Sequence, residues 1–430
     1  MQENTSPTLK RSLRITHLWS LAVGLVISGS YFGWNYGWDV AGPVGFLVAT
    51  LLVTVFFIGF IFSFTELNSR IPDAGGPFAF GKAAFGKWGG WLAGYATLVE
   101  FVFAPPAIAF ALGSYLNFLN PTFPVLPIAI GSFVVFTAIN GIGIKESARF
   151  NLWITLLAVV ELLAFIGIAA PSFELPRFLA HDPGFTWSGV FAALPFAIWF
   201  YLGIEGVALV SEEVIEPKRT IPRGYFWGLL TLILLTFGVM FMAGGAADWQ
   251  TLRTIDYPLP EAMSQILGGN SQWSRLFAGL GLFGLIASFH SLIIGYARQI
   301  FALSRAGILP HSLQKLNTRY QTPNRALFVG SIIGILCLLT GKTSDIIILS
   351  AFGAVTMYAI SLLSLFQIRK KNAAPASFQT PGYPVVPFIT LILAFLCLIA
   401  LAVFNPIHGL IFLGGATLWV GYLLISTHRK

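Results

Sequence analysis

Four ionisable side chains lie inside long apolar stretches of the sequence: Glu100, Glu161, Glu205 and His290. A charged group within a bilayer usually faces a cavity and marks the path of a substrate or an ion. Glu205 stands between Gly203 and Gly206, and we expect it to bind the ammonium group of a substrate, to carry a proton, or to do both. The alternative is a carboxyl group that only ties down the amides of a broken helix.

The other acidic and basic candidates carry less of the argument. Glu100 and His290 are second-rank candidates for substrate binding, and each could equally be a hydrogen-bonded packing residue. Glu161 is a candidate for proton handling. Glu66 comes at the end of its apolar stretch, shortly before Arg70, and is predicted to be a gate or loop contact rather than a substrate ligand.

Two apolar segments are interrupted by glycine near their middles, where the hydrocarbon would be thickest. A backbone that leaves the helix at this depth exposes N–H and C=O groups that lipid cannot satisfy. Broken segments at matching places in two halves of a chain indicate the binding site of a secondary transporter. The alternative is glycine that only allows close helix packing. The backbone predicted to bind the polar end of a substrate lies at Ser28, Gly29 and Ser30, with Gly203 at the second break.

Aromatic residues gather at both breaks. Tyr31 follows the first break, and Trp199 and Tyr201 precede Gly203 at the second. We expect these three side chains to face the cavity, because aromatic rings attract ammonium groups. Trp38 is predicted to be a membrane-interface anchor, a common role of tryptophan.

The composition indicates an all-α integral membrane protein. Of 430 residues, 56% are hydrophobic and only 10% are charged, whereas soluble proteins carry about 25% charged residues. We expect about twelve transmembrane helices, at residues 15–40, 44–66, 88–119, 123–141, 149–170, 188–211, 222–246, 273–303, 326–341, 344–367, 384–403 and 406–427.

The basic residues indicate the orientation of these spans. All of the 25 Lys and Arg residues except Arg177, Arg253, Arg275 and Lys342 fall on one side, a split of 21 against 4. This asymmetry predicts a multi-pass protein of the cell (inner or plasma) membrane with both termini cytoplasmic. The net charge of +8 therefore reflects topology and contact with the lipid bilayer, and no nucleic-acid partner is expected.

The spans divide into two predicted repeats of five. Because five is odd, the repeats are expected to have opposite topology, each starting with a broken helix. The predicted order is a cytoplasmic tail (1–14), repeat 1 with spans 1–5 (15–170), an extracellular loop (171–187), repeat 2 with spans 6–10 (188–367), a cytoplasmic linker (368–383), and spans 11–12 with the tail (384–430).

Sequence motifs for enzymes, metals and cofactors are not found. The run Gly279–Gly284 matches the dinucleotide fingerprint GxGxxG, but it lies in an apolar helix without a preceding strand, so close helix packing is predicted there. No metal site, catalytic residue or resident cofactor is expected. Coupling to H⁺ or Na⁺ and the oligomeric state both stay open.

Several motifs resemble the amino acid–polyamine–organocation transporters. These are Glu66–Phe78 at the end of span 2, Gly143–Arg149 between spans 4 and 5, Gly203–Glu205 with Glu212–Pro217 in and after span 6, and Ala302–Pro310 after span 8. The resemblance implies the inverted five-plus-five fold of the LeuT type, with helices 1 and 6 discontinuous and the substrate between them and spans 3 and 8. Some proton-coupled members carry a lysine within span 5, which residues 150–168 lack.

Within that family, Ile27–Gly37 looks most like the ethanolamine permeases, as does Glu161–Phe165 with Ala170 and Pro171. Amino-acid members usually keep small residues after the first glycine, leaving room for a carboxylate. Here Tyr31 and Phe32 follow at once, which favours a small amine. The resemblance thus implies a permease for a small organic amine such as ethanolamine, with an amino-acid permease or exchanger as the alternative. A membrane receptor or an enzyme using His290 with Glu205 is disfavoured, and a channel is less favoured still, because the broken helices are expected to form a closed central site rather than a lined pore.

Overall fold

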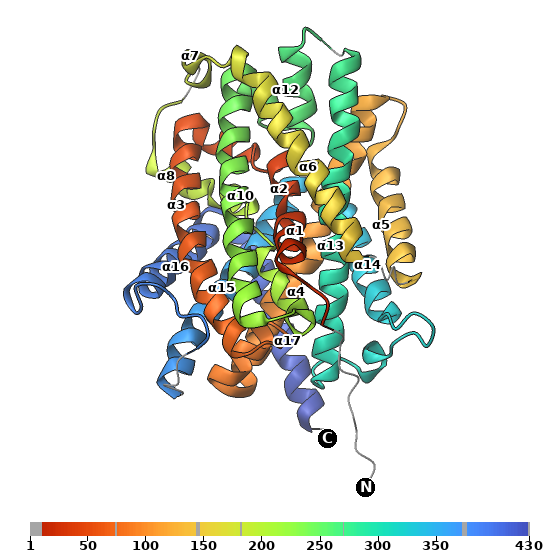
Figure 1. Ribbon diagram of the computed structural model, residues 1–430, viewed down its shortest axis with the longest axis vertical. Helices are drawn as coiled ribbons and strands as arrows, with labels where there is room; N and C mark the ends of the chain where they lie inside the picture. The colour runs from red at the N-terminus through yellow and green to blue at the C-terminus, as the bar shows by residue number, and fades with distance from the viewer. Residues whose placement is uncertain are drawn as a thin grey trace.

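The computed structural model describes residues 11–73, 75–142, 147–180, 183–269, 271–371 and 376–428. These residues form a bundle of helices (Figure 1) with a single isolated β-bridge, between Leu13 and Val214. The all-helical membrane class predicted from composition is therefore confirmed. Residues 1–10 of the predicted tail, residues 143–146 of the Gly143–Arg149 motif and residues 372–375 of the predicted linker lie outside the described residues.

Ten helical segments in the described chain are long and apolar enough to cross a membrane. They are α3 (Tyr36–Arg70), α4 (Pro77–Leu119), α5 (Val125–Ile142), α6 (Ser147–Ala169), the broken segment Leu194–Glu213, α10 (Pro217–Ala246), α13 (Gln272–Arg305), α15 (Thr343–Lys371), α16 (Val385–Phe404) and α17 (Pro406–His428). Two shorter apolar helices, α1 (Ile15–Val26) and α14 (Asn324–Leu338), add to these. Many large apolar side chains are exposed on the outside of the bundle, as lipid contact requires.

The first apolar segment is interrupted where the sequence predicts a break. Helix α1 ends at Val26, a single turn α2 spans Ser28–Tyr31, and helical structure resumes only at Tyr36. Inside α3, Gly42 has a φ of +64° and precedes Pro43. That left-handed residue, which favours glycine, bends the chain between the predicted first and second spans.

The sixth apolar segment is also broken. Helices α8 (Trp187–Ala192) and α9 (Leu194–Trp199) lead to Gly203, whose φ is +99°, and a 3₁₀ helix, η2 (Ile204–Glu213), follows. A residue with a side chain rarely adopts that φ, so Gly203 allows the chain to turn here. Two discontinuous helices at the predicted places are therefore features of the structure.

Helix contacts recur between the two five-span units. Helix α1 packs against α10, and the corresponding pair in the other unit is α9 against α3. Helix α4 packs against α15, and the corresponding pair is α13 against α6. Helices α4 and α13 also contact each other, as do α5 and α14. Each contact has a counterpart in the other unit, as expected for two structural repeats.

The two ends of the bundle differ, because three short α-helices lie at only one of them. We call the end where α1 begins and α3 ends the N-terminal side; α17 also ends there, at the bottom of Figure 1. Helices α7 (Leu175–Phe178), α11 (Trp249–Leu252) and α12 (Pro258–Ile266) belong to the opposite side, and α7 and α12 are labelled at the top of the same view. Helix α17 therefore ends on the same side of the bundle as the one on which α1 begins.

Candidate functional site

A serine from α13 inserts into the opening of the first helix. The amide of Ser28 donates to the Ser288 hydroxyl over 3.0 Å, and that hydroxyl donates to the carbonyl of Gly24 over 2.7 Å. In an unbroken helix these two backbone groups would bond to each other. Ser288 therefore satisfies the amide and the carbonyl that the break releases, and the amide of Ser28 is not free for a substrate, contrary to the sequence-based expectation.

The two breaks touch directly. A Cβ atom on Gly29 would lie 2.4 Å from the carbonyl oxygen of Trp199, closer than real Cβ contacts allow. The indole of Trp199 donates to the carbonyl of Phe32 over 3.0 Å. Ser30 is fully buried beside this contact, and its hydroxyl has no partner among the described residues.

Tyr31 joins the first break to α6. Its hydroxyl lies 2.7 Å from Oε2 of Glu161, and its carbonyl accepts a hydrogen bond of 3.1 Å from Tyr115 of α4. Glycine at position 284 of α13 makes room for the Tyr31 ring, since a Cβ there would lie 2.3 Å from it. The second oxygen of Glu161, Oε1, is buried without a partner among the described residues. The close packing predicted for the GxGxxG run is found at Gly281 and Gly284, where a Cβ atom would lie 2.9 Å from Tyr115 and 2.3 Å from Tyr31, but not at Gly279, which has no described atom within 4 Å.

Two carboxyl groups meet at the second break. The hydroxyl of Tyr358, on α15, lies 3.4 Å from Oε1 of Glu100 and 3.2 Å from Oε2 of Glu205. The two carboxyl groups also interact with each other and with the backbone amide of Gly203. Both side chains are buried, and one oxygen of each has no hydrogen-bond partner among the described residues. Glu100 and Glu205 thus form one acidic cluster with Tyr358.

Aromatic rings from α3 and from the turn after α9 surround this cluster. The ring of Tyr358 lies 4.4 Å from that of Phe60 and 5.5 Å from that of Phe57. Phe57 in turn lies 5.0 Å from Tyr201, whose hydroxyl bonds to Thr54 over 2.7 Å. The ring faces near the carboxyl pair are suited to an organic cation.

His290 lies apart from these groups. Its ring faces Phe136 and Phe150, at centroid distances of 6.2 and 6.4 Å, and its Nδ1 has no partner among the described residues. Two residues along a helix correspond to a rotation of about 200°, so Ser288 faces α1 while His290 faces α5 and α6. The structure does not bring His290 together with Glu205.

A cavity of about 290 Å³ leads from the N-terminal side toward the second break. Its walls come from α1, α6, η2 and α13, and they include Leu25, Gly206 and Gly295 at the inner end and Arg298 with Glu213 at the mouth. Arg298 and Glu213 form an ion pair of 3.2 Å. Since Gly206 adjoins Glu205, the cavity reaches the neighbourhood of the carboxyl pair.

The opposite side is closed by contacts to the α11–α12 segment. The side-chain amide of Asn35 donates to the carbonyls of Leu252 and Ile255 over 2.7 and 2.8 Å. Asp256 accepts from Tyr36 over 2.5 Å and from Thr343 over 3.0 Å. Burial raises the pKa of Asp256 above its ordinary value, although these two hydroxyls partly offset the effect.

Trp38 also belongs to this closed side, and its predicted role is wrong. It is only 1% exposed, and its ring packs edge-on against Trp34 and Trp249 at 4.6 and 6.3 Å. Helix α11, which carries Trp249, covers it. A ring buried among protein side chains is not an anchor at the membrane surface.

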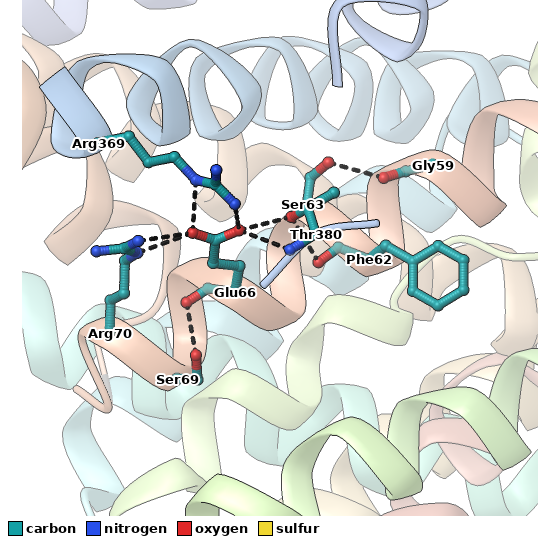
Figure 2. A network of polar contacts seen from close by, with 8 residues as sticks. All are labelled: Gly59, Phe62, Ser63, Glu66, Ser69, Arg70, Arg369 and Thr380. Carbon is teal, nitrogen blue, oxygen red and sulfur yellow. Dashed lines mark hydrogen bonds and ion pairs between the residues drawn. The ribbon is translucent and has the colours of Figure 1, made fainter. Parts of the chain in front are cut away.

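Glu66 anchors a polar network at the N-terminal side (Figure 2). It forms ion pairs with Arg70 over 2.9 Å and with Arg369 of α15 over 2.5 Å. Its Oε2 also accepts from the amide and the hydroxyl of Thr380, both over 2.8 Å. Glu66 thus links the end of α3 to α15 and to the segment before α16, which is the loop contact that the sequence predicts.

Sequence reasoning missed several residues that build the site. Ser288 and Tyr358 connect helices that are distant in sequence, and so does Asp256. For Ser288 and Tyr358, a polar residue inside an apolar helix is the only available signal, and many other serines and tyrosines share it. Among the described residues, no group of three or more His, Cys, Asp or Glu side chains is placed to hold a metal ion.

The fold and the site together define a class of protein: a helical membrane transporter whose polar groups lie where two helices are broken. The chain belongs to the amino acid permease family, whose model matches residues 15–425. Proteins of this family and the curated relatives are transporters, which confirms that the chain is not an enzyme.

Relatives of different substrate class show similar levels of identity. The chain is 25% identical to the branched-chain amino acid permease BcaP of Bacillus subtilis over 94% of its length and 91% of the relative. It is 27% identical to a methylthioribose transporter of the same species, over 90% and 88% of the two chains. It is 25% identical to the low-affinity putrescine importer PlaP of Escherichia coli, over 77% and 75%.

Proposed function

We propose that the protein is a secondary active permease that carries a small organic amine, such as ethanolamine, across the cell membrane by alternating access. The observation that carries this proposal is the Glu100–Glu205 pair, whose unpartnered oxygens lie beside the second break. Buried carboxyl groups of this kind require a proton or a cation. An ammonium group would supply both the charge and the missing hydrogen-bond donors.

The proposed site places the amine between the carboxyl pair and the first break. Glu205 and Glu100 would bind the ammonium group, and the rings of Trp199 and Tyr201 would exclude water from it. The unpartnered hydroxyl of Ser30 would meet the polar end of the substrate, beside Gly29. Glu161, joined to the first break through Tyr31, is the proposed route by which protonation would influence that break.

A second candidate is an amino-acid permease. The family description and the name of the Bacillus subtilis relative both support it. The buried hydroxyl of Ser30 would then bind a substrate carboxylate in place of an alcohol. The amide of Ser28, which is already bonded to Ser288, would contribute nothing to that carboxylate, and this favours the amine.

The orientation is also part of the proposal. The excess of Lys and Arg on the N-terminal side would place that side in the cytoplasm. The cavity that ends near Gly206 would then open inward, with the α11–α12 segment closing the outside. A protease that cleaves a tag after residue 430 from outside intact cells would contradict this orientation.

Uptake by proteoliposomes tests the two candidates against each other. We expect labelled ethanolamine to accumulate, and excess unlabelled ethanolamine to displace it far better than alanine or leucine does. Displacement by alanine or leucine, with no effect of ethanolamine, would favour the amino-acid permease. Failure of all three to be taken up or to compete would contradict both candidates.

A further inference from the structure

We propose that the Glu100–Glu205 pair holds one shared proton when no substrate is bound, and that the ammonium group of the substrate displaces that proton. This inference rests on the proposed function, and it specifies how the transport cycle is coupled to protons. One proton leaves the pair for each ammonium group that binds. The net charge of the occupied and the unoccupied pair is then the same, and proton and substrate cannot share the site.

The hydrogen bonding of the pair requires a proton in addition to that of Tyr358. The hydroxyl of Tyr358 lies within reach of both carboxyl groups but has only one hydrogen to donate. The remaining oxygens, Oε2 of Glu100 and Oε1 of Glu205, have no hydrogen-bond partner among the described residues, although the backbone amide of Gly203 lies near the pair. A proton on either carboxyl group would let that group donate to the other. Two adjacent carboxylates cannot both be ionised without a compensating charge.

The surroundings of the pair supply no compensating cation. Among the described residues, neither Glu100 nor Glu205 forms an ion pair, and Glu100 is fully buried. The other titratable groups that face the pair are Tyr358 of α15 and Tyr225 of α10. Phenylalanine rings face it from α3, and Arg298 of α13 lies at the cavity mouth, paired with Glu213.

Proton and substrate would use the same path. Leu25 and Gly206 line the cavity, and Gly206 packs closely against Leu25 and Phe101, since a Cβ on Gly206 would lie 2.9 and 3.1 Å from their side chains. Glu205 is the next residue, so a small movement of α1 against η2 would connect the pair with this cavity. Exchange at one site makes the transporter a proton–amine exchanger, in which the two cations move in opposite directions.

The experiment is to measure the ethanolamine dissociation constant of the purified full chain at several pH values at which ethanolamine stays protonated. Exchange of one proton predicts that Kd falls about tenfold for each unit of rising pH. Proton release on binding, followed with an indicator dye in weak buffer, should be about one per ethanolamine. A Kd that does not change with pH, or that follows the Na⁺ concentration instead, would overturn the proposal.

Matched variants locate the effect. Glu100→Gln leaves no shared proton for ethanolamine to displace, so the ethanolamine binding that it keeps should have a Kd that no longer depends on pH. Glu174→Gln replaces an exposed carboxyl group of the opposite side and should keep the pH dependence of the wild type. An unchanged pH dependence in Glu100→Gln would show that the exchanged proton lies elsewhere and would overturn the proposal.

An infrared measurement tests the proton without any substrate. The spectrum of the ligand-free wild type at neutral pH should contain a protonated-carboxyl band that is lost in Glu100→Gln and kept in Glu174→Gln. If ethanolamine fails to bind but this band behaves as expected, the proposed function is wrong and the shared proton stands. Identical bands in the wild type and in Glu100→Gln would overturn the shared proton.

Discussion

Ser288 and Ser28 are joined by a hydrogen bond that stands in place of a backbone hydrogen bond of the first helix. The hydroxyl of Ser288 accepts from the Ser28 amide and donates to the Gly24 carbonyl, so a side chain from α13 occupies the opening of the broken helix. This contact couples the first and eighth spans at the depth where the sequence predicts substrate binding. A movement of α13 would therefore shift the broken first helix, and a movement of that helix would shift α13.

Replacing Ser288 by alanine should weaken this arrangement. The Ser28 amide and the Gly24 carbonyl would lose their partner, and an unsatisfied buried group costs about 1–3 kcal/mol. We expect a lower unfolding temperature and slower uptake of ethanolamine. Ser364→Ala is the matched control, because the Ser364 hydroxyl donates only to Ile360 within its own helix. Equal effects of the two substitutions would show that the bridge has no special role.

The contact between the two breaks leaves no room for a side chain at Gly29. A methyl group there would lie 2.4 Å from the Trp199 carbonyl, so Gly29→Ala should push the two breaks apart. We expect strongly reduced uptake and a loss of stability of about 1–3 kcal/mol, as for other overpacked positions. Gly131→Ala is the control, since no atom of the described residues lies within 4 Å of a methyl group there. Normal uptake by Gly29→Ala would contradict the close contact.

The buried network of Glu66 should contribute substantially to stability. Glu66→Gln leaves Arg369 and Arg70 without their shared carboxylate, and breaking a buried ion pair costs about 3–5 kcal/mol. Denaturation of the purified protein should show this loss. Glu174→Gln, which removes an exposed ion pair with Arg177, should change stability by less than about 1 kcal/mol. A loss as small as that control's would show that the network in Figure 2 is not stabilising.

Asp256 should make stability depend on pH at the closed side. Its pKa is raised in the folded protein because the side chain is buried, so the folded state binds this proton more tightly than the unfolded state does. The resulting stabilisation is complete below the unfolded pKa of about 3.9 and is lost as pH rises through the folded pKa. Asp256→Asn removes the titration.

Thermal unfolding between about pH 4 and pH 8 checks this contribution of Asp256. The stability of the wild type relative to Asp256→Asn should fall as pH rises. Asp345→Asn, at a side chain that is 40% exposed, serves as the control for general charge effects. Parallel pH profiles of the wild type and Asp256→Asn would show that Asp256 does not titrate in this range.

Much of the fold could be predicted because membrane spans carry a strong local signal. Apolar runs of about twenty residues set the helices, and glycine with polar neighbours indicated the breaks at Ser28 and Gly203. Glu205 and Glu100 could be chosen because a carboxyl group is costly in hydrocarbon. The same argument also selected His290. The cost of a polar group in hydrocarbon indicates that the residue is buried, but it does not indicate which face of the helix the residue occupies.

The remaining parts of the site depend on contacts between distant segments. Tyr358 meets Glu100 and Glu205 across three helices, and nothing in the local sequence separates it from other tyrosines. Trp38 was misassigned because the sequence does not reveal that Trp249 and the rest of α11 fold over it. Such contacts follow from the packing of the bundle rather than from the periodicity of any one helix.

The central claim is that the carboxyl pair at the second break binds an organic ammonium group. The most direct measurement is the Kd of ethanolamine for the purified wild type and for Glu205→Gln, determined at one pH in the same detergent. The unfolding temperatures of the two proteins should agree within a few degrees. We predict that Glu205→Gln then binds ethanolamine at least about tenfold more weakly than the wild type, a difference of ~1.4 kcal/mol in binding free energy. An unchanged Kd in that variant would contradict the claim.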